Sequence, residues 1–219
     1  MRRVLATLFG LAAGSAGAQD SAPATLPWLA GQAGEERTIR DHGPIDFGSQ
    51  RLTAVELLFY YRDPWKFADF AIPEGPAAFW TLHEPSQQRV AAAVLVWSDA
   101  TPVCGQEVLP GVDGPIAGFM APDAAQRLQQ ENIRAEDAGQ GAYADWVEPQ
   151  SPEASFARFM TLPDGTRFPG FSTGWGDGGY PVVRLNDKQG NIVAVYADFI
   201  GHEPDGKFIL PPPCRTAGT

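Results

Sequence analysis

The residues best suited to chemistry are two carboxylates in the C-terminal third of the chain. Asp177 lies inside the glycine-rich segment Gly174–Pro181, and Asp198 ends an apolar, strand-like run. Two acids that share one site can separate their pKa values and act as general acid and general base. Carboxylates also bind hard divalent cations. One hypothesis is therefore a carboxylate-based hydrolase that uses Asp177 and Asp198 as catalytic residues, with a divalent cation as an option.

Asp177 also has a structural interpretation, which we favour. Gly174–Pro181 contains four glycines, and glycine predominates where φ must be positive or where another group approaches the backbone closely. An Asp in such a turn commonly accepts hydrogen bonds from its own backbone. We expect Trp175 and Tyr180 to pack this turn against a sheet. If the turn binds a ligand, Trp175, Asp177 and Tyr180 are the residues predicted to contact it.

Two strand-like runs must position these residues. Val182–Leu185 and Ile192–Phe199 are apolar and are separated by a polar segment that ends in Gly190-Asn191, which predicts a β-hairpin. Because side chains in a strand alternate between faces, Asp198 should share a face with Tyr196. The simpler role for Asp198 is to cap the strand end or to pair with a cation such as Arg184.

The remaining pattern predicts an α+β fold, a single domain dominated by antiparallel β-sheet with one or two helices. A helix is expected to begin at Pro122, since proline is favoured at a first helical position, and to continue through Asn132. A second, shorter helix is expected within Pro149–Phe159. Further strands are predicted at Leu52–Tyr61, Ala77–Leu82 and Arg89–Ser98.

The first 18 residues have the features of a secretory signal peptide. Arg2 and Arg3 precede a short apolar run, and Ala16-Gly17-Ala18 has the small-residue pattern found before a cleavage site. We expect cleavage after Ala18, followed by a flexible mature N-terminus over residues 19–37. The folded domain is then expected over 38–205 and a proline-rich tail over 206–219. This organisation predicts a periplasmic or secreted protein that is soluble, with no stable membrane insertion after cleavage.

The chain is acidic, with a net charge of −10. This balance argues against nucleic-acid binding, which depends on clustered Lys and Arg. An acidic surface suits a basic protein partner, although its simplest consequence is solubility. We favour solubility as the explanation of the charge itself.

Cys104 and Cys214 are the two cysteines of the chain. Two thiols in an exported protein are expected to pair, because that compartment is oxidising. The alternative is a pair of inert thiols, one of them in the proline-rich tail. No metal or other cofactor is predicted. His83–Pro85 and His202–Pro204 are both His-Glu-Pro, but zinc needs three or four ligands at a recognisable spacing, so we interpret them as loop residues.

Several segments together resemble a bacterial family, domain of unknown function 4241 (DUF4241). The strand Arg89–Asp99 resembles that family's Arg-Val-Ala-Ala … Ser-Asp strand, and Ile72–Trp80 resembles the turn and strand before it. Gly174–Pro181 followed by Asp198-Phe199 resembles the family's most specific signature. Ile116–Ala121 departs from the family pattern, since it lacks a hydroxyl and a carboxylate common there. The resemblance implies a domain and no reaction.

Three functions remain open at this level. The favoured one is an exported, non-catalytic binding or protein-interaction module, one version of which is antitoxin-like. The hydrolase described above is the alternative. A structural envelope protein is the third, although the chain contains no repeats. No complete catalytic group supports the enzyme, because the glycine-rich segment has neither nucleophile-elbow nor nucleotide-loop spacing.

Overall fold

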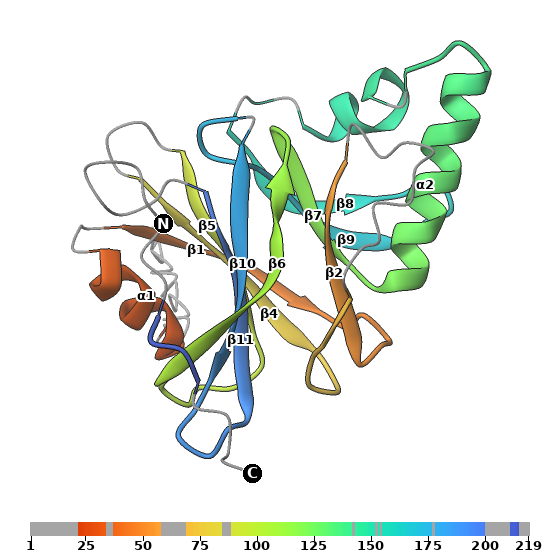
Figure 1. Cartoon of the computed structure of the whole chain (residues 1–219). Coiled ribbons are helices and arrows are strands. Elements are labelled where there is room, and N and C mark those ends of the chain that lie inside the picture. The colour runs from red at the N-terminus through yellow and green to blue at the C-terminus, as the bar shows by residue number, and fades with distance from the viewer. Residues whose placement is uncertain are drawn as a thin grey trace, which may run out of the picture.

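A computed structural model describes residues 22–33, 37–57, 69–84, 89–141, 143–151, 153, 155–176, 178–199 and 211–214. The predicted signal peptide, Asp177 and His202 lie outside these residues. The described part consists mainly of two antiparallel β-sheets with flanking helices (Figure 1). This arrangement confirms an α+β fold dominated by antiparallel sheet.

The larger sheet has six strands in the order β1-β4-β5-β11-β10-β6. Their bounds are β1 Thr38–Ile45, β4 Ala77–His83, β5 Val90–Val96, β6 Cys104–Asp113, β10 Gly179–Asn186 and β11 Ile192–Asp198. The predicted hairpin is confirmed as β10 and β11, whose register places Val183 opposite Tyr196. In its turn, Asp187 Oδ1 accepts hydrogen bonds from the backbone N–H groups of Gln189 and Asn191.

The smaller sheet has five strands in the order β3-β2-β7-β9-β8. Their bounds are β2 Arg51–Glu56, β3 Phe70–Ala71, β7 Ile116–Met120, β8 Ala157–Thr161 and β9 Arg167–Ser172. The predicted strand at Leu52–Tyr61 corresponds to β2 over its first half, and residues 58–61 lie outside the described part.

The main core lies between the two sheets and is rich in aromatic rings. Phe171 of β9 packs within 5.1 Å of Phe119 and 5.3 Å of Phe199, measured between ring centroids. Phe79 of β4 lies 6.3 Å from Phe171. All three partners of Phe171 are fully buried. These contacts connect β4 and the end of β11 in one sheet with β7 and β9 in the other.

The N-terminal region differs from the prediction of a flexible segment over 19–37. Helix α1, Thr25–Ala33, forms within it. Leu26 and Leu29 are buried against the outer face of the six-stranded sheet, in a cluster that includes Val94 and Tyr196. Because this cluster covers one face of β5 and the main core covers the other, every residue of Val90–Val96 is buried. Burial of the two leucines against the sheet therefore stabilises a helix in a segment that was predicted to be flexible.

Helix α2, Pro122–Asp137, confirms the helix predicted to begin at Pro122 and extends beyond Asn132. It packs Ala124, Ala125 and Leu128 on the outer face of the five-stranded sheet, and Figure 1 shows α1 and α2 on opposite sides of the molecule. The second predicted helix is wrong. A short π-helical segment, Tyr143–Val147, and a 3₁₀ turn, Glu148–Gln150, come first, and β8 occupies residues 157–161 instead.

Within the described residues, none of the helices combines the length and apolar character that crossing a membrane requires.

Candidate functional site

The glycine-rich segment forms a turn between β9 and β10 that is held by two buried hydroxyl side chains. Thr173 Oγ1 lies 2.6 Å from the carbonyl oxygen of Gly114 and 2.8 Å from that of Gly176. The hydroxyl of Tyr180 donates to the same Gly176 carbonyl at 2.7 Å. Gly176 has a φ of +101°, which a side chain would oppose. The described part of the turn is therefore a fixed shape rather than a loose loop.

Trp175 is the exposed residue of this turn. The prediction that it packs against the sheet is wrong, since its exposed fraction is 53%, whereas Tyr180 is buried as expected at 5%. The guanidinium carbon of Arg89 lies 4.6 Å from the centre of the indole ring. Arg89 also donates from Nη1 to the carbonyl oxygen of Gly174 at 2.7 Å. Arg89 thus connects the indole and the turn backbone to the start of β5.

Of the two carboxylates predicted to share a site, the structure describes Asp198. Asp198, at the end of β11, lies opposite Ala92 of β5 and is 1% exposed. It occupies the outer face of the six-stranded sheet together with Tyr196, as predicted. Burial raises the pKa of the Tyr196 hydroxyl well above its ordinary value, and the nearby charges of Asp198 and Glu107 raise it further. Asp177 lies outside the described residues, so the structure gives no separation for the two carboxylates.

Arg184, the cation considered for Asp198, lies opposite Val195 in the hairpin. Its Nη2 donates to Oε1 of Gln106 on β6 at 2.7 Å. Arg184 therefore helps to join β10 to the edge strand of the sheet.

A chain of polar side chains that the sequence did not reveal joins β1 to β4. Nε2 of His42 lies 2.8 Å from Oγ1 of Thr81, and the same oxygen lies 2.9 Å from Nε2 of His83. His42 is the extra residue of a β-bulge between Asp41 and Gly43, and bulges redirect side chains in this way. The one available sequence signal was the turn-like Asp-His-Gly-Pro at this point. His83 itself is 1% exposed within β4, so interpreting it as a loop residue was wrong.

His42 should make stability depend on pH. Its pKa is lowered from 6.5 to about 4, first by burial and then by the charge of His83. Between pH 4 and pH 6.5 the unfolded chain binds more protons at His42 than the folded chain does. The contribution of His42 to the free energy of unfolding is therefore complete above pH 6.5 and is lost as the pH falls towards 4. Because the ring is partly exposed, we expect a loss of about 1–2 kcal/mol.

The measurement is urea denaturation at several pH values for the wild type and for His42→Gln. The difference in unfolding free energy between the two proteins should shrink as the pH falls from 6.5 to 4. Parallel pH curves for the two proteins would contradict the assignment of this effect to His42.

Among the described residues, no group of three or more His, Cys, Asp or Glu side chains is arranged to hold a metal ion.

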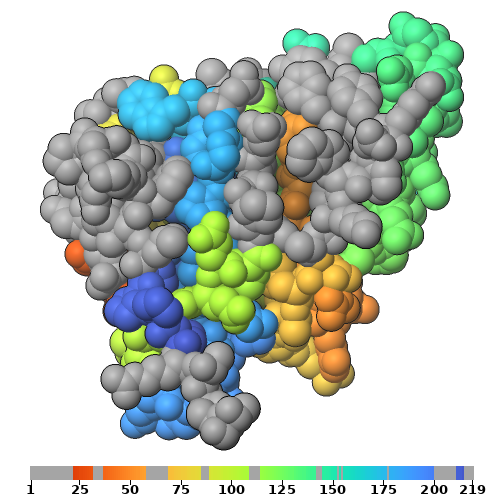
Figure 2. Space-filling view, viewed as in Figure 1, coloured from red at the N-terminus to blue at the C-terminus, as the bar shows by residue number. Residues whose placement is uncertain are grey.

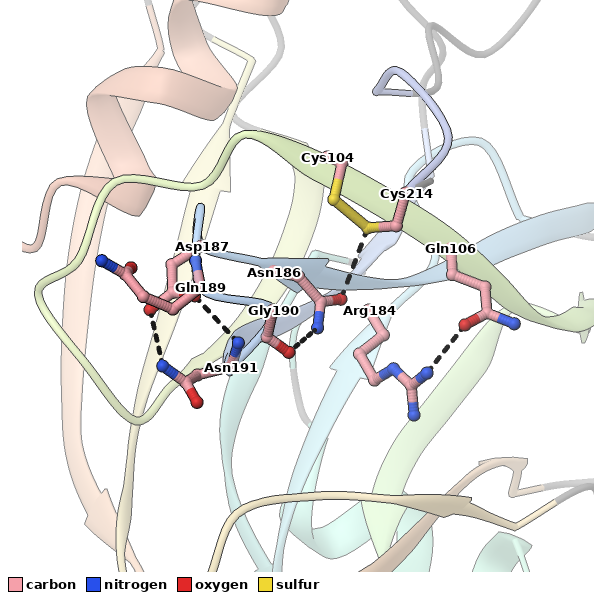
Figure 3. Close-up of a disulfide and its surroundings, with 9 residues drawn as sticks. All are labelled: Cys104, Gln106, Arg184, Asn186, Asp187, Gln189, Gly190, Asn191 and Cys214. Atoms are coloured by element: carbon pink, nitrogen blue, oxygen red, sulfur yellow. Dashed lines mark hydrogen bonds between the residues drawn. A yellow bond between two sulfur atoms is a disulfide. The ribbon is translucent and has the colours of Figure 1, made fainter. Parts of the chain in front are cut away.

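The predicted disulfide between Cys104 and Cys214 is present, with a Cα–Cα distance of 4.8 Å (Figure 3). It borders an open groove of about 990 Å³. In the tail, Pro213 forms an isolated parallel bridge with Gly105. Gly105 N–H donates to the Pro212 carbonyl oxygen at 2.9 Å, because proline lacks a donor but keeps its acceptor.

Comparison with known proteins yields one family. The model described as "Protein of unknown function (DUF4241)" matches residues 84–197, which are 114 of the 219 residues. This span includes β5, the glycine-rich turn and nearly the whole β10–β11 hairpin. No curated protein matches the chain, and no solved structure matches it.

Proposed function

The chain belongs to the DUF4241 family, whose description assigns no activity, and from the geometry of its turn we propose that it is an exported, non-catalytic protein-interaction module. The export element of this proposal rests on the signal-peptide features of residues 1–18. The interaction element rests on the turn between β9 and β10. The main supporting observation is that Trp175 is exposed, on a turn fixed by hydrogen bonds, and lies beside Arg89.

Trp and Arg are among the residues that most often dominate binding energy at protein interfaces. A large aromatic ring on a rigid support loses little conformational entropy when a partner covers it. Trp175 meets this condition because Thr173 and Tyr180 fix the turn through Gly176. Among the described residues, Trp175 and Val103 are the only large hydrophobic side chains that are exposed.

The net charge of −10 would suit a basic partner, since opposite charge accelerates encounter between proteins, although solubility is its simpler explanation. An antitoxin-like protein that neutralises a basic effector is one version of this function. The genes beside those of several homologues provide an inexpensive test. If none of them encodes a toxin-like protein, the antitoxin version fails while the interaction module stands.

Replacing Trp175 with alanine is expected to weaken partner binding by about 30-fold or more, the effect of losing a central interface residue worth about 2 kcal/mol. The unfolding free energy should change little, since the indole ring is mostly exposed. The measurement is affinity capture of the partner with immobilised mature protein, followed by titration of the purified partner.

Val103→Ala is the matched control, since Val103 is the other large hydrophobic side chain that is exposed within the described part of the chain. Its affinity for the partner should equal that of the wild type. Equal affinity for Trp175→Ala and wild type would overturn the proposed site. A thermal-shift screen against metals, sugars and anions should be flat, because a bound small ligand would raise stability by RT ln(1 + [L]/Kd).

A further inference from the structure

The C-terminal segment 211–214 lies along the start of β6, at the edge of the six-stranded sheet. Figure 2 shows this segment, in dark blue, on the surface beside the green of β6. Pro211 is buried, and its ring contacts the position where Gly105 lacks a side chain. A Cβ built on Gly105 would lie 2.3 Å from Cγ of Pro211 and 2.9 Å from Cγ1 of Val183. Glycine at position 105 is therefore what allows the segment to pack here.

The non-covalent attachment of this segment is small. Between described residues it comprises the hydrogen bond from Gly105 N–H to the Pro212 carbonyl oxygen, a weaker one from Cys214 N–H to the Gly105 carbonyl oxygen at 3.3 Å, a 3.7 Å contact between Cys214 Sγ and Asn186 Oδ1, and the buried Pro211 ring. The free energy gained from two hydrogen bonds and one buried apolar ring is similar in size to the conformational free energy lost when four residues are ordered. These contacts therefore do not decide by themselves whether the segment stays bound. The covalent bond between Cys104 and Cys214 adds to them.

The disulfide is also placed where a reductant can reach it. Both half-cystines are partly exposed, and both line the open groove of about 990 Å³. Figure 3 shows the bond at the margin of the sheet, near Asn186 of the β10–β11 hairpin. Cys214 belongs to segment 211–214, which forms a single β-bridge to β6. Each strand of the six-stranded sheet is hydrogen-bonded to a neighbouring strand of that sheet and does not depend on this β-bridge.

We propose that the Cys104–Cys214 disulfide is a reducible latch that holds residues 211–214 on the edge of β6. An external dithiol supplies the two electrons. Its thiolate attacks one sulfur of the bridge, the other sulfur leaves as a thiolate, and the second thiol of the reductant displaces the mixed disulfide. The protein gains two thiols and the reductant becomes a disulfide. Residues 211–214 then leave β6, while both sheets remain folded.

Release would change the surface in a defined way. It frees the N–H and the carbonyl of Gly105, which are edge groups able to pair with another extended chain. It also removes the Pro211 ring from beside Gly105, at a point where a Cβ on Gly105 would lie 2.9 Å from Cγ1 of Val183 and 3.2 Å from Cδ2 of Leu185. The latch therefore regulates the exposure of a strand edge at the end of the molecule that carries the β10–β11 turn, away from Trp175.

The test uses the full mature chain in dithiothreitol under native conditions, with released thiols trapped by iodoacetamide and amide exchange followed by NMR. We expect two alkylated cysteines per chain, at least about tenfold faster exchange of the Gly105 and Cys214 amides, and unchanged protection of Val195 in β11. Continued protection of Gly105 after alkylation would overturn the latch. Simultaneous loss of protection at Gly105 and Val195 would overturn it as well, since reduction would then unfold the sheet.

Three variants sharpen this test. Gly105→Ala, in the oxidised protein, should displace Pro211 and raise the rate of reduction, whereas Val103→Ala, on the groove rim, should leave that rate unchanged. The variant with Cys104→Ser and Cys214→Ser should show fast exchange at Gly105 without any reductant. If it does not fold, the alkylated wild-type chain still decides the question.

Discussion

Replacing Phe171 with alanine is expected to lower the free energy of unfolding by about 3–5 kcal/mol. Phe171 is fully buried and lies at the centre of the aromatic core, in contact with rings from β4, β7 and the end of β11. Truncation removes its apolar surface from the core and leaves a cavity that fixed strands on both sides cannot close. Urea denaturation, followed by the near-ultraviolet signal of the aromatic residues, measures the loss.

Phe171→Leu is the matched control for this prediction. It keeps most of the volume, so a clearly smaller loss is expected, on the order of 1–2 kcal/mol. An alanine variant that loses less than the leucine variant would show that the two sheets do not depend on this contact.

Removing the disulfide is expected to lower the free energy of global unfolding by about 4–5 kcal/mol in the chain-entropy model. The bridge joins residues 110 apart in the sequence, so its loss frees the unfolded chain over a long loop. Guanidinium denaturation of the oxidised chain and of the variant with Cys104→Ala and Cys214→Ala measures the difference. The slope of the transition should rise slightly, since the unfolded state becomes more extended.

The disulfide has two separately measurable effects, one on the free energy of global unfolding and one on the local release of residues 211–214. The denaturation experiment reports the cost of unfolding both sheets, whereas exchange at Gly105 reports the release of residues 211–214. Equal midpoints for the oxidised and cysteine-free proteins would contradict the stability prediction. That result would leave the latch standing if Gly105 still exchanged faster without the bond.

The elements predicted correctly are those with strong local signals. The hairpin β10–β11 has nearly continuous apolar runs on both sides of an Asn- and Gly-rich turn, and α2 begins at a proline followed by an acid. Such signals act within a few residues and do not need a partner from elsewhere in the chain. The pairing of Cys104 with Cys214 was also predicted, from their number and from the expected compartment.

The elements that were missed depend on distant partners. Helix α1 is fixed by burial of Leu26 and Leu29 against a sheet whose strands come later in the sequence. The β8 strand, predicted as part of a helix, is fixed by its pairing with β9. Strand β1 contains Asp41-His42-Gly43-Pro44, which suggests a turn, yet a bulge accommodates these residues at the sheet edge.

The same division between local sequence signals and contacts with distant residues applies to the candidate site. The sequence by itself determined the family, the glycine-rich turn and its Trp, because glycine spacing is a local property of the backbone. The tertiary structure decided which side chain faces solvent. The Tyr180 and Thr173 hydroxyls bind the turn from inside, and Arg89, 86 positions before Trp175 in the chain, holds the indole at the surface. That exposure is a property of packing between distant strands, which no local pattern encodes.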